Sequence, residues 1–179
     1  MLESIAKRRL DHFEREWDYD VTYLREMLNA GGIEALAPMQ AAEKLSSYRR
    51  DIPIAAYFAA KLVAARHGDC GPCLQLGVKM AERAGVSPEI IRNALQHNVD
   101  ALPEDVALAI EFAESSLNRE PSAAVLREAI VQRWGKRALI SLSYAIAGTL
   151  FYPVFKYVFG YGHACSIVQI GSEAAPVHA

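Results

Sequence analysis

Cysteine is scarce in this sequence, and an excess of basic charge is absent. Three cysteines occur among 179 residues, and an odd number is atypical of a secreted disulfide framework. Lys and Arg total 19 against 21 Asp and Glu, so the net charge of -2 offers no basic face to nucleic acid or an anionic membrane surface. We therefore expect no nucleic-acid partner, and we expect the thiols to be kept reduced and used chemically.

Long hydrophobic runs are also few. The first eleven residues carry Lys7, Arg8 and Arg9 and lead into no apolar core of secretory type, so we expect a cytoplasmic protein. The longest uncharged run, residues 138–155, has 18 residues, but Ser, Thr, Gly and Pro dilute it and Lys156 follows at once. We expect this run to be buried in a core or subunit interface, not in a bilayer.

Alternation of polar and apolar residues with period two is nearly absent, whereas apolar residues recur every three or four positions. This pattern predicts an all-α fold, a compact bundle of about seven to eight helices. The length favours a single domain, residues 1–179. Within it we expect a dithiol core at about residues 54–95 and a C-terminal tail at about residues 163–179.

Caps and turn residues set the expected boundaries. Gly31-Gly32 is expected to stop the second helix, and Gly85 followed by Ser87-Pro88 gives a strong stop and restart. The expected helices cover residues 5–17, 21–29, 38–49, 54–66 and 74–84, a segment from Ser87, and residues 103–117, 122–134 and 136–157.

The most specific motif is a Cys-Gly-Pro-Cys stretch from Cys70 to Cys73. Gly68-Asp69 breaks the preceding helix, so Cys70 should lie at or just before the first turn of the next one, where Pro72 is tolerated. Unpaired amide donors and the helix dipole favour a thiolate at that position. Residues i and i+3 on a helix lie about 5 to 6 Å apart, so a reversible disulfide could form.

Two other interpretations of the dithiol stay open. The cysteines could simply pack as small buried hydrophobic residues, although their spacing beside a helix start favours a function. They could also bind zinc together with His163 and Cys165 from the tail, but His-x-Cys is an awkward pair of ligands.

The order of elements around the dithiol carries a resemblance. An apolar helix over residues 54–66 leads into the dithiol, residues 74–84 continue as helix, Gly85 ends it, and Ser87 starts the next. This arrangement resembles the carboxymuconolactone decarboxylase and alkylhydroperoxidase D superfamily, most closely over residues 54–95. The resemblance implies an all-α subunit assembled as a trimer or hexamer. It also implies that the dithiol reduces peroxides or passes electrons to a partner peroxidase.

The chain departs from that family's peroxidase motif at two positions. The family has a histidine four residues after the second cysteine and a glutamate about a dozen residues before the first, which together relay protons to the thiols. Here these positions are Gly77 and Phe58. The residues that could substitute for the relay are Tyr57, Lys61, His67, His163 and Cys165.

The leading hypothesis is a thiol-dependent oxidoreductase in which Cys70 and Cys73 cycle between dithiol and disulfide. It would act on a peroxide or a protein disulfide, take electrons from a thiol reductant, and need no bound cofactor or metal. The alternative is a non-catalytic helical oligomer whose dithiol is structural, metal-binding or redox-sensing. A decarboxylase-like enzyme of the same fold is a third hypothesis.

Overall fold

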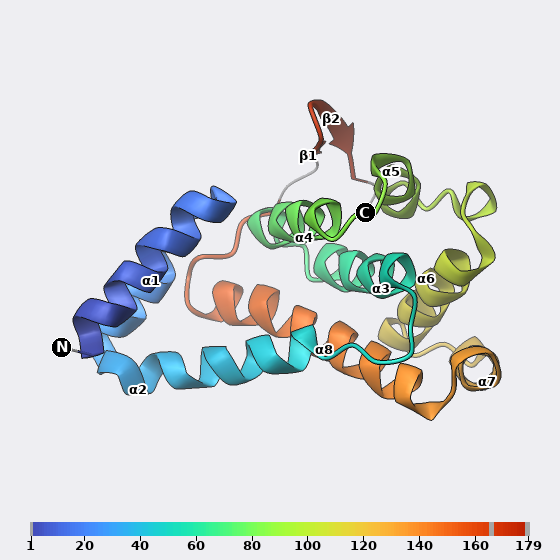
Figure 1. Cartoon of the computed structure of the whole chain (residues 1–179), viewed down its shortest axis with the longest axis horizontal. Helices are drawn as coiled ribbons and strands as arrows, with labels where there is room; N and C mark the ends of the chain where they lie inside the picture. The colour runs from blue at the N-terminus through green and yellow to red at the C-terminus, as the bar shows by residue number, and fades with distance from the viewer. Residues whose placement is uncertain (1, 165–166, 178–179) are drawn as a thin grey trace.

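The computed structural model describes residues 2–164 and 167–177, and over this part of the chain it is a bundle of eight α-helices with one small hairpin (Figure 1). The all-α prediction is confirmed. The helices are α1 (Leu2–Trp17), α2 (Thr22–Ser47), α3 (Ile54–His67), α4 (Gly71–Arg83), α5 (Pro88–Leu95), α6 (Glu104–Leu117), α7 (Ser122–Trp134) and α8 (Lys136–Val158), with a 3-10 turn at Val99–Ala101. The hairpin pairs β1 (Ile167–Ile170) with β2 (Glu173–Pro176), antiparallel.

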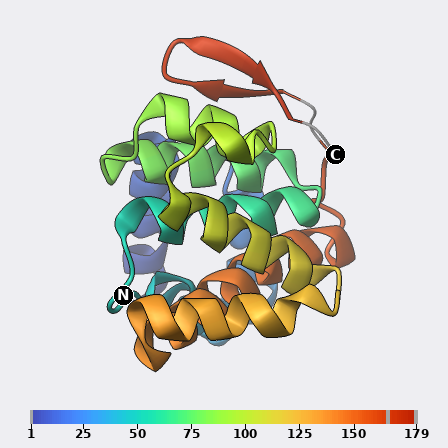
Figure 2. The ribbon, with the colours of Figure 1, turned by 90° about the vertical axis from the view of Figure 1, so that its right-hand side faces the viewer.

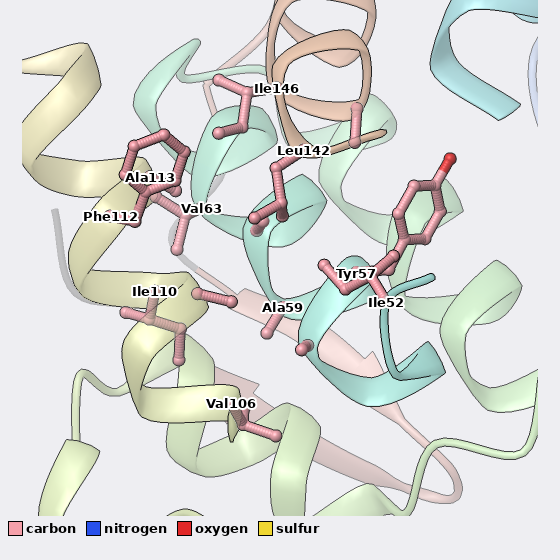
Figure 3. Close-up of a cluster of buried hydrophobic side chains, with 14 of the residues drawn as sticks. Ile52, Tyr57, Ala59, Val63, Val106, Ile110, Phe112, Ala113, Leu142 and Ile146 are labelled. Carbon is pink, nitrogen blue, oxygen red and sulfur yellow. The ribbon is translucent and has the colours of Figure 1, made fainter. Parts of the chain in front are cut away.

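Helix α3 occupies the centre of the bundle and packs against α4, α5, α6 and α8. Its sequence is apolar nearly all round, as expected for a helix surrounded by others. Ala56, Ala60 and Ala64 are completely buried, and their small side chains let neighbouring helices approach closely. Ile110 from α6 and Leu142 from α8 fill the space between these helices (Figure 3). This packing holds the C-terminal end of α3, and therefore the dithiol, in place.

Helix α2 joins the two helical segments that the sequence predicted on either side of Gly31-Gly32. It runs from Thr22 to Ser47, and Gly32, with a φ of 64°, marks a kink where two helices meet without a loop. The expected stop at Gly31-Gly32 is therefore confirmed, because Gly32 leaves the helical conformation, but the chain is helical again directly after it and not only from residue 38. Arg25, on the segment before the kink, ties α2 to α1 through Glu14 at 2.6 Å.

Helix α8 has a buried face and an exposed apolar face. It is long and apolar enough to cross a bilayer, with a mean hydropathy of 1.6 over its most apolar window. One face, however, packs in the protein core through Ala138, Leu142 and Ala145, as expected for a core helix. A Cβ added at Gly148 would lie 2.8 Å from the backbone nitrogen of Ser46, which shows how closely α8 approaches α2.

The C-terminal tail forms a hairpin that the sequence analysis did not predict. Val168 and Ile170 point inward and pack on α4 and α5, and Gln75 on α4 bonds both backbone groups of Gln169, at 2.7 and 2.9 Å. Figure 2 shows the hairpin at one end of the molecule, against α4 and α5, and α7 at the other. Each strand has four residues, so its alternation is too short to stand out from the helical pattern.

Candidate functional site

The two cysteines of the motif are joined as a disulfide at the start of α4. Helix α3 ends at His67, Gly68 and Asp69 turn the chain, and Cys70 is the residue just before the first helical residue of α4. The Cα atoms of Cys70 and Cys73 are 5.3 Å apart. The predicted placement and spacing are therefore confirmed.

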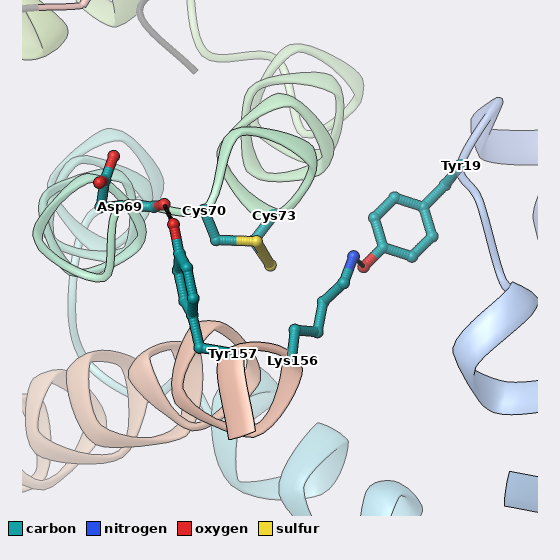
Figure 4. The surroundings of a disulfide bond; sticks show 6 residues. All are labelled: Tyr19, Asp69, Cys70, Cys73, Lys156 and Tyr157. Atoms are coloured by element: carbon teal, nitrogen blue, oxygen red, sulfur yellow. Dashed lines mark hydrogen bonds between the residues drawn. A yellow bond between two sulfur atoms is a disulfide. The ribbon is translucent and has the colours of Figure 1, made fainter. Parts of the chain in front are cut away.

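Helix α8 fixes the turn that precedes the disulfide. A Cβ added at Gly68 would lie 2.5 Å from the side chain of Pro153, so only glycine fits between α3 and α8 at this point. The Tyr157 hydroxyl donates a hydrogen bond of 2.8 Å to the backbone carbonyl of Asp69. Figure 4 shows the disulfide pointing toward α8, with Tyr157 and Lys156 on either side of its sulfur atoms.

The two cysteines differ in exposure. Cys70 is 1 % exposed, whereas Cys73, one turn into α4, is partly exposed. The Gly71 amide donates a hydrogen bond of 2.8 Å to the His163 carbonyl, so the tail folds back onto the start of α4. This bond corrects the expectation that all amide donors at the helix start are unpaired. The tail is thus bonded to the start of α4 next to Cys70, and Cys73 is the more accessible of the two cysteines.

An open pocket of about 850 Å³ lies on the Cys70 side of the motif. Its lining includes a polar cluster in which Arg66 contacts Glu114 at 2.5 Å and His97 contacts the same carboxylate oxygen at 3.0 Å. Tail residues Ala164 and Val177 line it as well. Because Cys70 is almost fully buried, it forms part of the pocket wall but is barely open to it.

The residues that could substitute for the proton relay lie in different parts of the structure, and only some of them are near the disulfide. The exposed side chain of His67 lines the pocket beside Cys70, and His163 reaches the motif through its backbone carbonyl while its side chain is exposed. Cys165 lies outside the described residues. Tyr57 and Lys61 both donate to the Ser46 carbonyl at the end of α2, at 2.6 and 2.7 Å.

Gly77 and Phe58, the two positions that the resemblance aligns with a proton relay, are both packing positions. A Cβ at Gly77 would meet the Leu62 side chain of α3 at 3.3 Å, and the Phe58 ring packs against the core and lies 5.8 Å from the Lys61 ammonium. Neither position carries a group that accepts or donates a proton.

Lys156 is a further candidate residue, which the sequence did not indicate. This lysine is 3 % exposed, and its ammonium lies 3.2 Å from the Tyr19 hydroxyl and 4.9 Å from the ring centres of Tyr19 and Tyr23. Burial lowers the pKa of Lys156 from its ordinary value, and the nearby Asp20 carboxylate opposes that change. The one signal in the sequence is a lone lysine directly after a long apolar run, which also fits a helix that is simply ending.

The structure offers no metal centre in the part of the chain it describes. Within residues 2–164 and 167–177, no three His, Cys, Asp or Glu side chains gather as ligands, and the two thiols of the zinc hypothesis are joined to each other. No family model, curated protein or solved structure matches the chain.

Proposed function

We propose that the protein is a thiol-dependent oxidoreductase that cycles Cys70 and Cys73 between dithiol and disulfide. The observation that carries the proposal is the asymmetric disulfide at the start of α4, with Cys70 buried and Cys73 accessible. A thiol that exchanges with substrates must be reachable, whereas the resolving thiol attacks within the protein and needs no access for the substrate. The resemblance to the alkylhydroperoxidase D superfamily supports the same chemistry.

The cycle proceeds in two exchange steps. The Cys73 thiolate attacks one sulfur of a substrate disulfide, so a mixed disulfide forms and the other substrate sulfur leaves as a thiolate. The Cys70 thiolate then attacks the Cys73 sulfur, which releases the second substrate thiolate and forms the Cys70–Cys73 disulfide. The substrate has gained two electrons, and an external dithiol returns the protein to its reduced state.

A peroxide could replace the disulfide as oxidant. The Cys73 thiolate would take the terminal oxygen and become sulfenic acid while the alkoxide leaves with a proton. The Cys70 thiol would then condense with it, releasing water. Proton delivery to the leaving group matters more in this reaction, and Gly77 and Phe58 cannot supply it. We therefore propose disulfide exchange as the main activity and weak peroxide turnover.

The proposal is tested by a redox titration of the purified protein. We expect the Cys70–Cys73 disulfide to form and open reversibly in dithiol buffers between about -180 and -320 mV, the range of cellular thiol couples. Trapping with an alkylating reagent and mass spectrometry measure the disulfide fraction, with Cys70→Ser/Cys73→Ser as the control. A disulfide that stays closed across this range would refute the proposal. A reversible disulfide without exchange on model disulfides would favour the redox-sensing alternative.

We also propose that copies of this chain associate through the exposed face of α8. Exposed apolar residues recur along this face at helical spacing over about 27 Å, namely Ile140, Tyr144, Phe151, Val154 and Val158. The opposite face of α8 is already buried in the core, so lipid cannot surround the helix. A second copy of the same apolar face matches its chemistry and its length.

Charge on that face is expected to separate the copies. Phe151→Glu/Val154→Glu should convert an oligomer to monomers, as measured by analytical ultracentrifugation, because a carboxylate cannot be buried there without a partner. Val125→Glu is the control, since Val125 is 70 % exposed on α7. A wild-type chain that sediments as a monomer at micromolar concentration would contradict this part of the proposal.

A further inference from the structure

Lys156 is a buried cation without a paired anion in the described part of the chain. Its ammonium donates a hydrogen bond to the Tyr19 hydroxyl. Within residues 2–164 and 167–177, no carboxylate forms an ion pair with it. The Asp20 carboxylate exerts an electrostatic effect on Lys156, but it already accepts a hydrogen bond of 2.8 Å from the Thr22 amide. A buried charge of this kind is costly unless an opposite charge faces it.

Cys73 lies near Lys156, Tyr19 and Tyr23, which together we call the aromatic corner. Residues one helical turn apart share a face of α4, and the face that begins at Cys73 continues through Leu76 and Lys79. Leu76 packs in the aromatic cluster that contains Tyr19, and the Lys79 ammonium donates to the Trp17 carbonyl at 2.7 Å. Cys73 therefore faces the place where the segment after α1 meets α8. Figure 4 shows Lys156 and Tyr19 there, beside the disulfide.

We propose that the Lys156 ammonium is the electrostatic partner of the Cys73 thiolate in the reduced protein. Lys156 is thus a positioning residue that stabilises the thiolate and does not itself transfer a proton. When a dithiol reduces the disulfide, Cys73 is released as a thiolate and Lys156 keeps its proton, so an anion at a partly exposed position faces a buried cation. This inference rests on the proposed function, because it concerns the reduced state of the same cycle.

Among the residues that the structure describes, Lys156 is the buried cation of this corner near neutral pH. Burial raises the pKa of Tyr19 to about 12 and also raises that of Tyr23, so both phenols stay neutral. The Asp20 carboxylate is exposed, and its pKa is lowered by its hydrogen bonds to Thr22. Other titratable side chains near the corner are Tyr152 and Tyr161 of the same aromatic cluster, Tyr157 beside the disulfide, and the ion pair of Lys79 with Asp18 at 3.2 Å.

The test measures the pKa of the Cys73 thiol directly. In a Cys70→Ser/Cys165→Ser background Cys73 is the sole cysteine, and its rate of alkylation by iodoacetamide is followed from pH 5 to 10. We expect an apparent pKa below the ordinary thiol value of about 8.5. Lys156→Met should raise that pKa by about one pH unit or more, and Lys156→Arg should keep it near the starting value.

Lys61→Met is the matched control, because Lys61 is also a largely buried lysine near two aromatic rings, but its ammonium bonds to Ser46. It should leave the pKa of Cys73 unchanged. An unchanged pKa in Lys156→Met would overturn the inference. If that variant does not fold, a pKa of Cys73 at or above about 8.5 with Lys156 in place would overturn it equally.

The two proposals fail separately. A disulfide that titrates reversibly in the wild type, combined with a pKa of Cys73 that ignores Lys156, removes the role of Lys156 and keeps the oxidoreductase. A low pKa of Cys73 that depends on Lys156, combined with a disulfide that never opens, removes the oxidoreductase and keeps the ion pair.

Discussion

Cys73→Ser is expected to abolish thiol–disulfide exchange, whereas Cys70→Ser is expected to stop the cycle one step later. Cys73 is the accessible cysteine of the motif, so its loss leaves Cys70 as the remaining motif thiol, which is 1 % exposed. The rate should fall to that of the uncatalysed exchange. Without Cys70, attack still proceeds, but no thiol resolves the product. Cys70→Ser should therefore accumulate a mixed disulfide between Cys73 and the substrate.

Mass spectrometry after incubation with oxidised glutathione distinguishes the two variants. Cys70→Ser should gain one glutathione on Cys73, and Cys73→Ser should remain largely unmodified at position 70. Both are compared in a Cys165→Ser background, which removes the third thiol of the chain. The reverse pattern would assign attack to Cys70 and would make the pocket lined by Arg66 and His97 the entry route.

Lys61→Met is expected to stabilise the protein near neutral pH and to flatten part of its pH dependence. Lys61 is largely buried between Tyr57 and Phe58, and burial lowers the pKa of its ammonium from 10.5 to about 8. Keeping the ammonium charged in the folded protein therefore opposes folding below pH 8. Methionine has a similar shape and no charge, and Tyr57 continues to donate to the Ser46 carbonyl that Lys61 shared.

The direction of the pH effect follows from proton binding. Between about pH 8 and 10.5 the unfolded chain holds the Lys61 proton and the folded chain releases it, so the free energy of unfolding rises with pH. Lys61 alone contributes a rise of about 2 kcal/mol between pH 7 and pH 9.5. The buried Lys156 adds a rise of the same sign. Above about pH 10, Tyr57, whose pKa is raised to about 12, acts in the opposite direction.

Urea unfolding at pH 7 and pH 9.5 measures this difference. The wild type should gain stability between the two values, and Lys61→Met should gain about 2 kcal/mol less. Lys79→Met is the control, since the Lys79 ammonium is held by backbone carbonyls near the surface and should leave the slope as it is. An identical slope in Lys61→Met would show that the folded protein accommodates the charge without cost.

Local sequence signals predicted much of the helical fold. The apolar periodicity of residues 54–66 predicted the central helix, and Ser87 caps α5 as expected, with its hydroxyl accepting from the Ile90 amide at 3.3 Å. These features depend on neighbours within one or two turns, so a sequence read in short windows reveals them. The break at Gly31-Gly32 was also predicted, because glycine favours the positive φ that it needs. The hairpin after Tyr161 was not predicted, because its short strands are held by packing on α4 and α5.

The sequence by itself determined the dithiol, its position at a helix start and the spacing that allows Cys70 and Cys73 to pair. Only the tertiary structure decided which cysteine is covered and which faces the aromatic corner with Lys156. The physical reason is the separation along the chain of the residues that decide each feature. Helix geometry brings residues three positions apart together wherever the helix lies. The exposure of a thiol, and the charge beside it, depend on residues from distant segments. Tyr19 and Lys156, for example, meet only when the core has formed.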